Sequence, residues 1–323
     1  MKTLSYFLFI ICLSVMSCSN APEQQVIITT PFISTLSSGT NTTLNGVFFE
    51  DAAKGYIVGD SGAIISTTDG GTTWSKVQTN FINPLYSCFA YNGIVYVGGE
   101  GIILYGDNIT TLNNTKKIGS TEVRSLTALG DGKIIAVGGY FGYNTTVGKV
   151  FVKNQNENTW SLLTDSLISL GTISDVVAIG NNNVIWCVPF CMNLGPCAGG
   201  LKNFDLSLSK EATITTVEHI TALSKNNSLL IGVGKSISRS VDNGLNWSQY
   251  STLNSAILTD IAMTRESIGF ACGEKGVLLR TEDGGVTWSA LSSGVTENLN
   301  ALYFPTSTVG YAVGDEGTII RLT

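Results

Sequence analysis

Residues 269–288 of the chain read GFACGEKGVLLRTEDGGVTW. It reads as a strand, a glycine-rich turn, a second strand and a tight turn that ends in a tryptophan. The same pattern occurs as GYIVGDSGAIISTTDGGTTW at residues 55–74. Its first half returns at residues 310–320 and its second half at residues 240–247. Such recurrence is typical of a protein built from one repeated β unit.

The tight turn has the composition of a β-hairpin, which we call the Asp turn. Its aspartate can accept hydrogen bonds from backbone N–H groups, its glycine supplies a positive φ, and its tryptophan begins the next strand. These roles are structural, and they predict no calcium or other metal site. The turn residues concerned are Asp69, Gly71 and Trp74, then Asp242, Gly244 and Trp247, then Asp283, Gly285 and Trp288.

Weaker copies of the pattern fill the intervals and give seven units. The hydrophobic residues that open them are Leu44, Leu85, Val123, Ile173, Val217, Leu258 and Leu299. A period of about forty residues with four short strands in each unit is that of a β-propeller blade. The sequence therefore predicts an all-β, seven-bladed β-propeller as a single domain over residues 31–323.

The two ends of the repeat region predict how the ring closes. The last unit ends at Thr323, where its outer strand should still follow. Residues 36–45 align without gaps on residues 291–300, so residues 32–36 correspond to the outer strand of the sixth unit. We therefore expect the N-terminal strand to complete the last blade, which removes an exposed sheet edge.

The N-terminus resembles a bacterial lipoprotein signal. A lysine is followed by an apolar run and by Val15-Met16-Ser17-Cys18, which is similar to a lipobox. We expect residues 1–17 to be the signal peptide, Cys18 to be lipidated, and residues 18–30 to be a tether. This predicts a protein of the bacterial cell envelope, held in the outer membrane by its lipid; an ordinary signal peptide is the alternative.

The remaining cysteines suggest one disulfide and no metal site. Cys191 and Cys197 bracket a short loop, so in an oxidising compartment they could form a loop-closing bond. A zinc site that adds Cys187 to them lacks a fourth ligand, because the only histidine, His219, lies in the next unit. No cofactor is expected.

The predicted functional surface is the rim of the central channel. It collects the turns between second and third strands, the starts of the inner strands, and an aromatic loop in the enlarged third unit. Polar residues in exposed turns are also the ordinary composition of such turns, which is the competing explanation. The candidates are Asp60, Tyr86, Glu100, Arg124, Tyr140, Phe141, Tyr143, Asp175, Glu218, His219, Asp260, Glu274, Asp315 and Glu316.

Net charge restricts the partners. The chain carries a formal charge of −6 and has a pI near 4.9, which argues against nucleic acid or an anionic lipid surface as a direct partner. An exposed rim of carboxylates and aromatics suits a protein of the envelope, or less readily a glycan. We expect a monomer that contacts the membrane through its lipid alone.

The repeat resembles that of photosystem II stability and assembly factors, over roughly residues 31–323. That resemblance implies a propeller which binds a membrane-protein subunit without turnover. Those proteins carry a positive patch, whereas this chain has only five dispersed arginines. Asp turns also occur in sialidases, so a glycoside hydrolase is the alternative; Tyr86, Glu218 and Asp260 would then be its candidate catalytic residues.

Overall fold

The computed structural model describes residues 31–141, 146–155, 157, 159–163, 171–188, 200–208, 210–215, 219–252 and 255–323. The chain divides into the units Met1–Pro31 and Phe32–Thr323, and the fold below is that of the second. Among the described residues, no helix has the length and apolarity needed to cross a membrane. The predictions for Cys18, Tyr143, Glu218, Cys191 and Cys197 fall outside the described residues.

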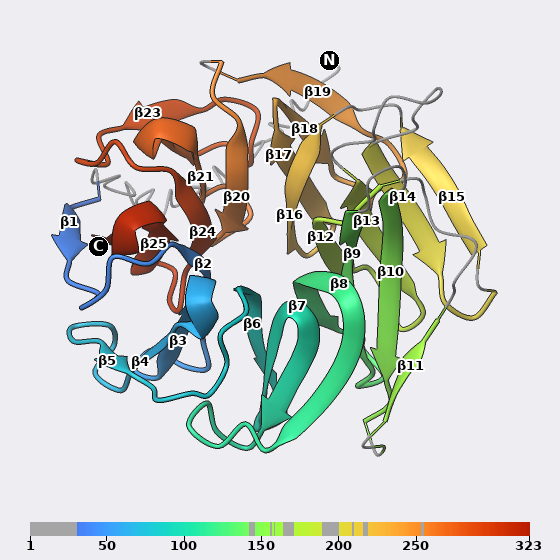
Figure 1. The fold of residues 1–323 in the computed structure, drawn as a ribbon. Coiled ribbons are helices and arrows are strands. Elements are labelled where there is room, and N and C mark those ends of the chain that lie inside the picture. Colours follow the sequence, from blue (N-terminus) through green and yellow to red (C-terminus); the bar gives the residue numbers. More distant parts are fainter. Residues whose placement is uncertain are drawn as a thin grey trace, which may run out of the picture. The chain divides into compact units, whose positions relative to one another are not determined.

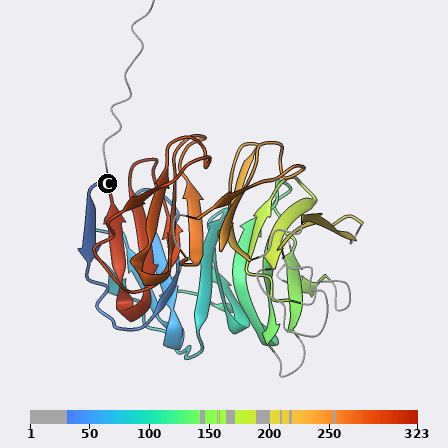
Figure 2. The ribbon, with the colours of Figure 1, turned by 90° about the horizontal axis from the view of Figure 1, so that it is seen from above.

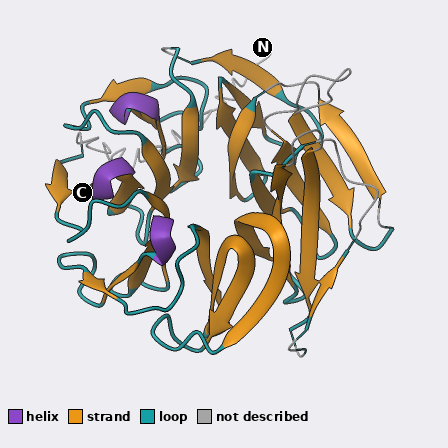
Figure 3. Ribbon diagram, in the orientation of Figure 1, coloured by secondary structure: helices purple, strands orange, loops and turns teal. Residues whose placement is uncertain are grey.

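In the residues that the structure describes, all regular structure is β apart from three single-turn 3-10 helices (Figure 3). Four-stranded antiparallel sheets make up most of it. The first is β2 (Leu44–Phe49), β3 (Gly55–Gly59), β4 (Ile64–Thr67) and β5 (Ser75–Lys76), with η1 (Asp60–Gly62) between β3 and β4. Three similar sheets follow later in the chain: β12 (Asp175–Ala178), β13 (Asn183–Val188), β14 (Gly200–Asp205) and β15 (Lys210–Thr215); β16 (Ile220–Asn226), β17 (Leu229–Gly234), β18 (Ser236–Ser240) and β19 (Ser248–Ser251); and β20 (Leu258–Met263), β21 (Gly269–Gly273), η2 (Glu274–Gly276), β22 (Leu278–Thr281) and β23 (Ser289–Leu291).

Two sheets differ from this plan. One has six strands, namely β6 (Leu85–Tyr91), β7 (Ile94–Gly106), β8 (Asn114–Ala128), β9 (Ile134–Phe141), β10 (Thr146–Lys153) and β11 (Trp160–Leu162). The other joins the two ends of the fold: β24 (Leu299–Tyr303), β25 (Gly310–Gly314), η3 (Asp315–Gly317) and β26 (Ile319–Leu322) pair with β1 (Ile33–Leu36). The sheets stand around a central channel in chain order (Figure 1).

The β-propeller class is confirmed, but the predicted count of seven blades is wrong when blades are counted as hydrogen-bonded sheets, of which there are six. The difference lies in the second and third units. Strand β7 continues through the predicted turn at Gly101, and β8 runs from the outer strand of one unit into the inner strand of the next. The pairing shifts register between Glu100 and Ile102 and again between Val123 and Ser125, so the long strands bend without ending.

Seven strands nevertheless line the channel, because the six-stranded sheet contributes two of them. These are β2, β6, β8, β12, β16, β20 and β24, and each contacts the next around the ring, with β24 returning to β2. The repeat that the sequence shows is therefore retained at the channel wall even where two units share one sheet.

The predicted closure is confirmed. Strand β1 pairs antiparallel with β26, with Ile33 opposite Leu322 and Leu36 opposite Ile319. Phe32 and Thr323 exchange two backbone hydrogen bonds, 2.7 and 2.9 Å long, at the end of this ladder. Figure 2 shows β1 beginning beside the C-terminus, on the side of the ring opposite to the 3-10 turns.

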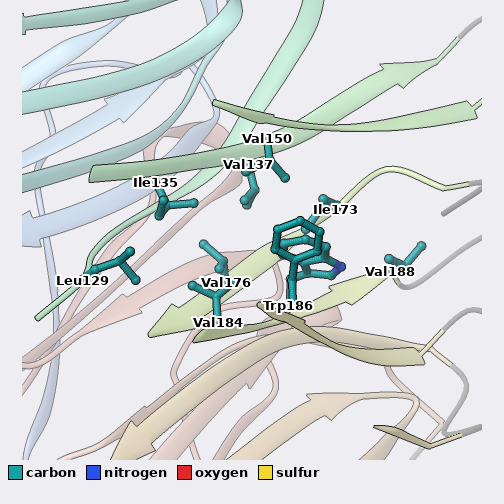
Figure 4. Close-up of a cluster of buried hydrophobic side chains, with 10 residues drawn as sticks. Leu129, Ile135, Val137, Val150, Ile173, Val176, Val184, Trp186 and Val188 are labelled. Carbon is teal, nitrogen blue, oxygen red and sulfur yellow. The ribbon is translucent and has the colours of Figure 1, made fainter. Parts of the chain in front are cut away.

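Apolar side chains fill the spaces between neighbouring sheets. Figure 4 shows one such interface, where Val137 and Val150 of the six-stranded sheet face Trp186 of β13. At the closing interface Phe49 stacks on Tyr311 of the last sheet, with ring centroids 4.8 Å apart. Each sheet thus buries both of its faces, which explains the near-continuous apolar runs in the second strands.

We predict that β1 contributes measurably to stability through its ladder. The reciprocal pair Phe32–Thr323 fixes the alternation, so the Ser34 N–H points at β26 and the Thr35 N–H points away from it. Ser34→Pro should lower the free energy of unfolding by about 1–3 kcal/mol, because it removes one ladder donor. Thr35→Pro is the matched control and should cost clearly less in the same denaturant titration. Equal losses would contradict this register.

Candidate functional site

The Asp turns have the predicted geometry. Asp242 accepts hydrogen bonds from the backbone N–H groups of Leu245 and Asn246, at 3.1 and 2.9 Å, and Ser240 donates to it at 2.7 Å. Gly244 has φ 84°, and the indole N–H of Trp247 donates to its carbonyl. Asp69 and Asp283 make the corresponding bonds, with Gly71 at φ 74° and Gly285 at φ 87°. Trp74 packs edge-on against Phe49, and Trp288 packs on a cluster shared with the preceding sheet.

These aspartates are already satisfied within their own turns. The hydroxyl and backbone N–H of Thr73 lower the pKa of Asp69 to about 2, and the bonds from Asn246 lower that of Asp242 to about 2. The turns also fasten neighbouring sheets, because the Arg239 Nε donates to the carbonyl of Gly284 at 2.7 Å. Tyr311 makes the corresponding contact to the carbonyl of Gly70. The predicted structural role of the turns accounts for their chemistry.

On the opposite side, the turn carboxylates of the rim hold the turns to the inner strands. Asp60 accepts from the Asn45 amide at 2.8 Å, and Asp315 accepts from the Asn300 amide at 3.1 Å. Glu274 accepts from the backbone N–H of Ile257 at 3.2 Å. Each 3-10 turn places its second residue at positive φ, and in the last turn this is the exposed Glu316. A binding role for these four carboxylates remains a prediction.

At the mouth of the channel, Tyr86 and Arg124 form one cluster. The Arg124 guanidinium lies 4.2 Å from the centre of the Tyr86 ring, and its Nε donates to Glu122 at 2.9 Å. Burial, and then the charge of Glu122, raise the pKa of Tyr86 to about 12. This phenol therefore stays protonated at neutral pH, and the Arg124 cation is neutralised by a neighbour.

The register predicted for the fifth unit is wrong by three residues. Ile220, not Val217, pairs with the glycine that ends the second strand, as Leu44 and Leu258 do in their own units. The position that we assigned to Glu218 therefore belongs to Thr221, which sequence reasoning missed. His219 lies directly before the strand with φ 61°, and its carbonyl accepts the Lys235 N–H at 3.1 Å.

A closed set of side-chain hydrogen bonds, here called the channel ring, joins the seven inner strands. In six of its links a polar side chain at the start of one strand donates to a backbone carbonyl of the next. In the remaining link, Ser125 donates to the Asp175 carboxylate at 2.6 Å. The six links are Asn45 to Leu85 (3.0 Å), Ser87 to Val123 (3.3 Å), Ser174 to Thr221 (2.7 Å), Thr221 to Leu258 (2.5 Å), Thr259 to Leu299, and Asn300 to Leu44 (3.0 Å).

Two carboxylates lie within this ring, half-buried in the channel wall. Asp175 also accepts the N–H of Leu223 at 2.7 Å, and Asp260 accepts the N–H groups of Ile261 and Leu302 at 2.7 Å each. Burial raises the pKa of both acids, and the charge of Asp175 contributes to bringing that of Asp260 to about 7. The structure thus gives both acids a structural role, and their predicted contact with a ligand remains untested.

The channel encloses a cavity of about 190 Å³, lined mostly by these polar residues. Arg124 is the one arginine among its lining residues, so the arginine cluster that a sialidase needs is not found there. Within the described part of the chain, no group of three or more histidine, cysteine or acidic side chains is placed to hold a metal ion.

A second hollow of about 290 Å³ opens on the rim beside Glu100. Phe81, Ile82 and Lys117 are among its lining residues, and Ile82 is 81% exposed. The charge of Glu100 also acts on Tyr86, which connects this hollow with the cluster at the channel mouth. Sequence reasoning found Glu100 but missed its apolar neighbours; an isoleucine in a polar loop between two units was the available signal. We call Phe81, Ile82, Glu100 and Lys117 the rim hollow.

Of the predicted aromatic loop, the structure describes Tyr140 and Phe141, which belong to strand β9. Strands β9 and β10 pair as far as Phe141 opposite Thr146. Tyr140 is partly exposed near this end, at 39%. The side chain of Phe141 is outside the described set, as is Tyr143. Of the cysteines that the structure describes, Cys88, Cys187 and Cys272 are free thiols.

These features define the molecule as a closed β-propeller with a polar channel and a partly apolar rim. Comparison with known proteins gives a more specific result. The family model "Photosynthesis system II assembly factor YCF48" matches residues 29–185, so the resemblance indicated by the repeats is confirmed at the level of the family. No curated protein gives a significant match in sequence.

Solved structures of that family have the same fold. A structure described as "YCF48 bound to D1 peptide" superposes with a TM-score of 0.68 at 20% identity, covering 90% of this chain and 96% of the other. YCF48 from Cyanidioschyzon merolae gives a TM-score of 0.66 at 18% identity, covering 90% and 98%. At these identities the likeness concerns the fold.

We predict that Asp260 makes stability depend on pH. Its pKa in the folded state is about 7, above its usual value of 3.8, so the fold favours the protonated acid. The free energy of unfolding should therefore fall as pH rises from about 4 to about 7. Asp260→Asn stays neutral and should flatten this slope in denaturant titrations at several pH values, even if it lowers the stability at pH 4.

Asp69→Asn is the control for this experiment. The pKa of Asp69 is lowered to about 2, so its contribution is lost only on acidification below about pH 4 and has the opposite sign. An unchanged slope in Asp260→Asn would show that Asp260 does not titrate in this range.

Proposed function

We propose that the protein is a non-catalytic scaffold which binds a segment of another protein on its rim. The rim hollow carries this proposal. It combines an exposed isoleucine and a phenylalanine with one acidic and one basic side chain, next to the Tyr86–Arg124 cluster. An apolar contact bordered by charges of both signs is the usual composition of a peptide-binding surface.

The relatives support a protein partner. One YCF48 structure is described as bound to a D1 peptide, so a propeller of this fold can bind a peptide. The present chain carries the fold without a concentration of arginines at the channel, where Arg124 is paired with Glu122. We infer a partner segment recognised chiefly by apolar side chains and mixed charges.

The geometry favours binding over hydrolysis. A tyrosine nucleophile needs a lowered pKa, whereas that of Tyr86 is raised to about 12. Asp260 has a raised pKa, but two backbone N–H groups hold its oxygens in the channel wall. Neither residue therefore has the properties of a hydrolase active site.

We also propose that the protein is a lipoprotein of the bacterial envelope, anchored through Cys18, with residues 18–30 as the tether. The support is the sequence of residues 1–18, with its apolar run and lipobox-like end. Such an anchor would hold the scaffold near a membrane in which its partner is assembled.

The rim proposal predicts where a partner can be crosslinked. A photoreactive side chain at position 82 should give a defined protein adduct in intact cells, and Glu100→Lys should reduce the yield by about tenfold, because it reverses a charge at the contact. The same group at Thr72, in the Asp turn of the first sheet, is the control position. Equal adducts at both positions, or an unchanged yield with Glu100→Lys, would contradict the proposal.

The anchor proposal predicts the distribution of the protein after cell fractionation. The unaltered chain should be recovered with membranes and carry a lipid on its first mature residue. Cys18→Ala should shift it to the soluble fraction, since the described domain offers no spanning helix. Recovery of Cys18→Ala in the membrane fraction at an unchanged level would exclude Cys18 as the anchor.

A further inference from the structure

Exposed apolar side chains gather on one arc of the Asp-turn side of the ring. Strands β14 and β15, β18 and β19, and β22 and β23 are joined there by turns at consecutive sheets, and β1 begins there on the next sheet. Of the eight large apolar side chains that are exposed in the described residues, five lie on this arc. They are Leu208, Val241, Leu245, Val286 and Phe32, here called the apolar arc.

The matching positions on the rest of this side are polar. In the Asp turn of the first sheet, the exposed Thr68 and Thr72 occupy the places of Val241 and Leu245. The next turn along the chain exposes Asp107, Thr110 and Thr111. Because the turn itself is formed equally well with threonine, its geometry does not require the apolar residues of the arc. A contact with another surface accounts for them.

The N-terminal end of the described domain lies on the same arc. Phe32 is 71% exposed and pairs with Thr323 at the outer edge of the last sheet. The 13 residue-to-residue steps from Cys18 to Pro31 can span at most about 45 Å when fully extended. A lipid on Cys18 would thus attach the domain on the side of the apolar arc.

From these observations we propose that the apolar arc rests on a lipid surface and turns the rim toward the aqueous side. This rests on the proposed anchoring through Cys18. Near the arc, the exposed Lys225 and Arg265 stand beside the exposed Glu266, so the local charge is mixed. The preferred surface is therefore one of zwitterionic phospholipid. An anionic membrane would repel a protein with a net charge of −6, whereas a zwitterionic membrane does not.

The arrangement has the two contributions that a stable peripheral contact needs. A single acyl group binds reversibly, whereas a few apolar side chains inserted at the interface add to its affinity and fix the orientation. With Leu245 and Val286 at the tips of neighbouring turns, the ring would meet the bilayer along one edge. The rim hollow would then face a partner that projects from the membrane.

The test uses the full-length acylated chain in phosphatidylcholine vesicles that contain a quencher-bearing lipid. A fluorophore is attached at a cysteine replacing Leu245, Thr72 or Glu316, and the unsubstituted chain gives the background from its own cysteines. We expect quenching at position 245 to be several-fold greater than quenching at position 72. The difference between position 245 and position 316 should be larger still. Leu245→Thr combined with Val286→Thr should abolish quenching of a fluorophore at Val241→Cys while the chain still floats with the vesicles.

The outcomes separate the two proposals. A chain that does not float with vesicles would contradict the proposed anchoring through Cys18. It would also contradict the proposed orientation, which depends on that anchoring. A chain that floats but shows equal quenching at all three positions overturns the apolar arc alone. Shielding of position 245 that appears without vesicles and grows with protein concentration would assign the arc to a second copy of the chain, which also overturns the proposal.

Discussion

The channel ring sets the positions of the seven inner strands relative to one another. Packing between sheets is apolar and not directional, whereas six of the seven ring bonds join one side chain to one backbone carbonyl of the neighbouring inner strand, and the seventh joins Ser125 to the Asp175 carboxylate. The ring therefore fixes how far each strand is displaced along the channel relative to the next. Both the Asp turns on one side and the rim turns on the other are positioned by these displacements. A change in one link would move functional loops at both ends of a blade.

Much of the fold could be predicted because the sequence repeats most regularly in the turns whose geometry requires particular residues. Asp283 and Gly285 require one geometry, and the turn has it. The predicted blade count is wrong where strand β7 continues through the glycine-rich residues 98–101 instead of ending there. Gly101, at φ 74°, permits a bend there, and the pairing with β8 resumes after a shift in register, so the two predicted strands form one long strand. Local composition does not distinguish these two results.

The candidate site was predicted less well than the fold, for three physical reasons. Hydrophobic residues three apart are equally good marks of a strand start, which led to Val217 in place of Ile220 and hid Thr221. A carboxylate near a channel also suggests ligand binding, but Asp175 and Asp260 use their oxygens on backbone N–H groups of neighbouring strands. The sequence does not show which carboxylate oxygens already accept a hydrogen bond within the fold. The rim hollow was missed because its apolar members come from a loop without a repeated pattern.

The pairing of β1 with β26 brings together residues from opposite ends of the chain, with Ile33 opposite Leu322. Synthesis releases Ile33 long before Leu322, so this ladder cannot form until β26 has been made. During that interval the earlier sheets can assemble pair by pair, but the circle stays open and the inner edge of β2 faces no neighbour. Closure of the ring thus comes after the other sheets can form, and until then β26 lacks the partner strand that covers its outer edge.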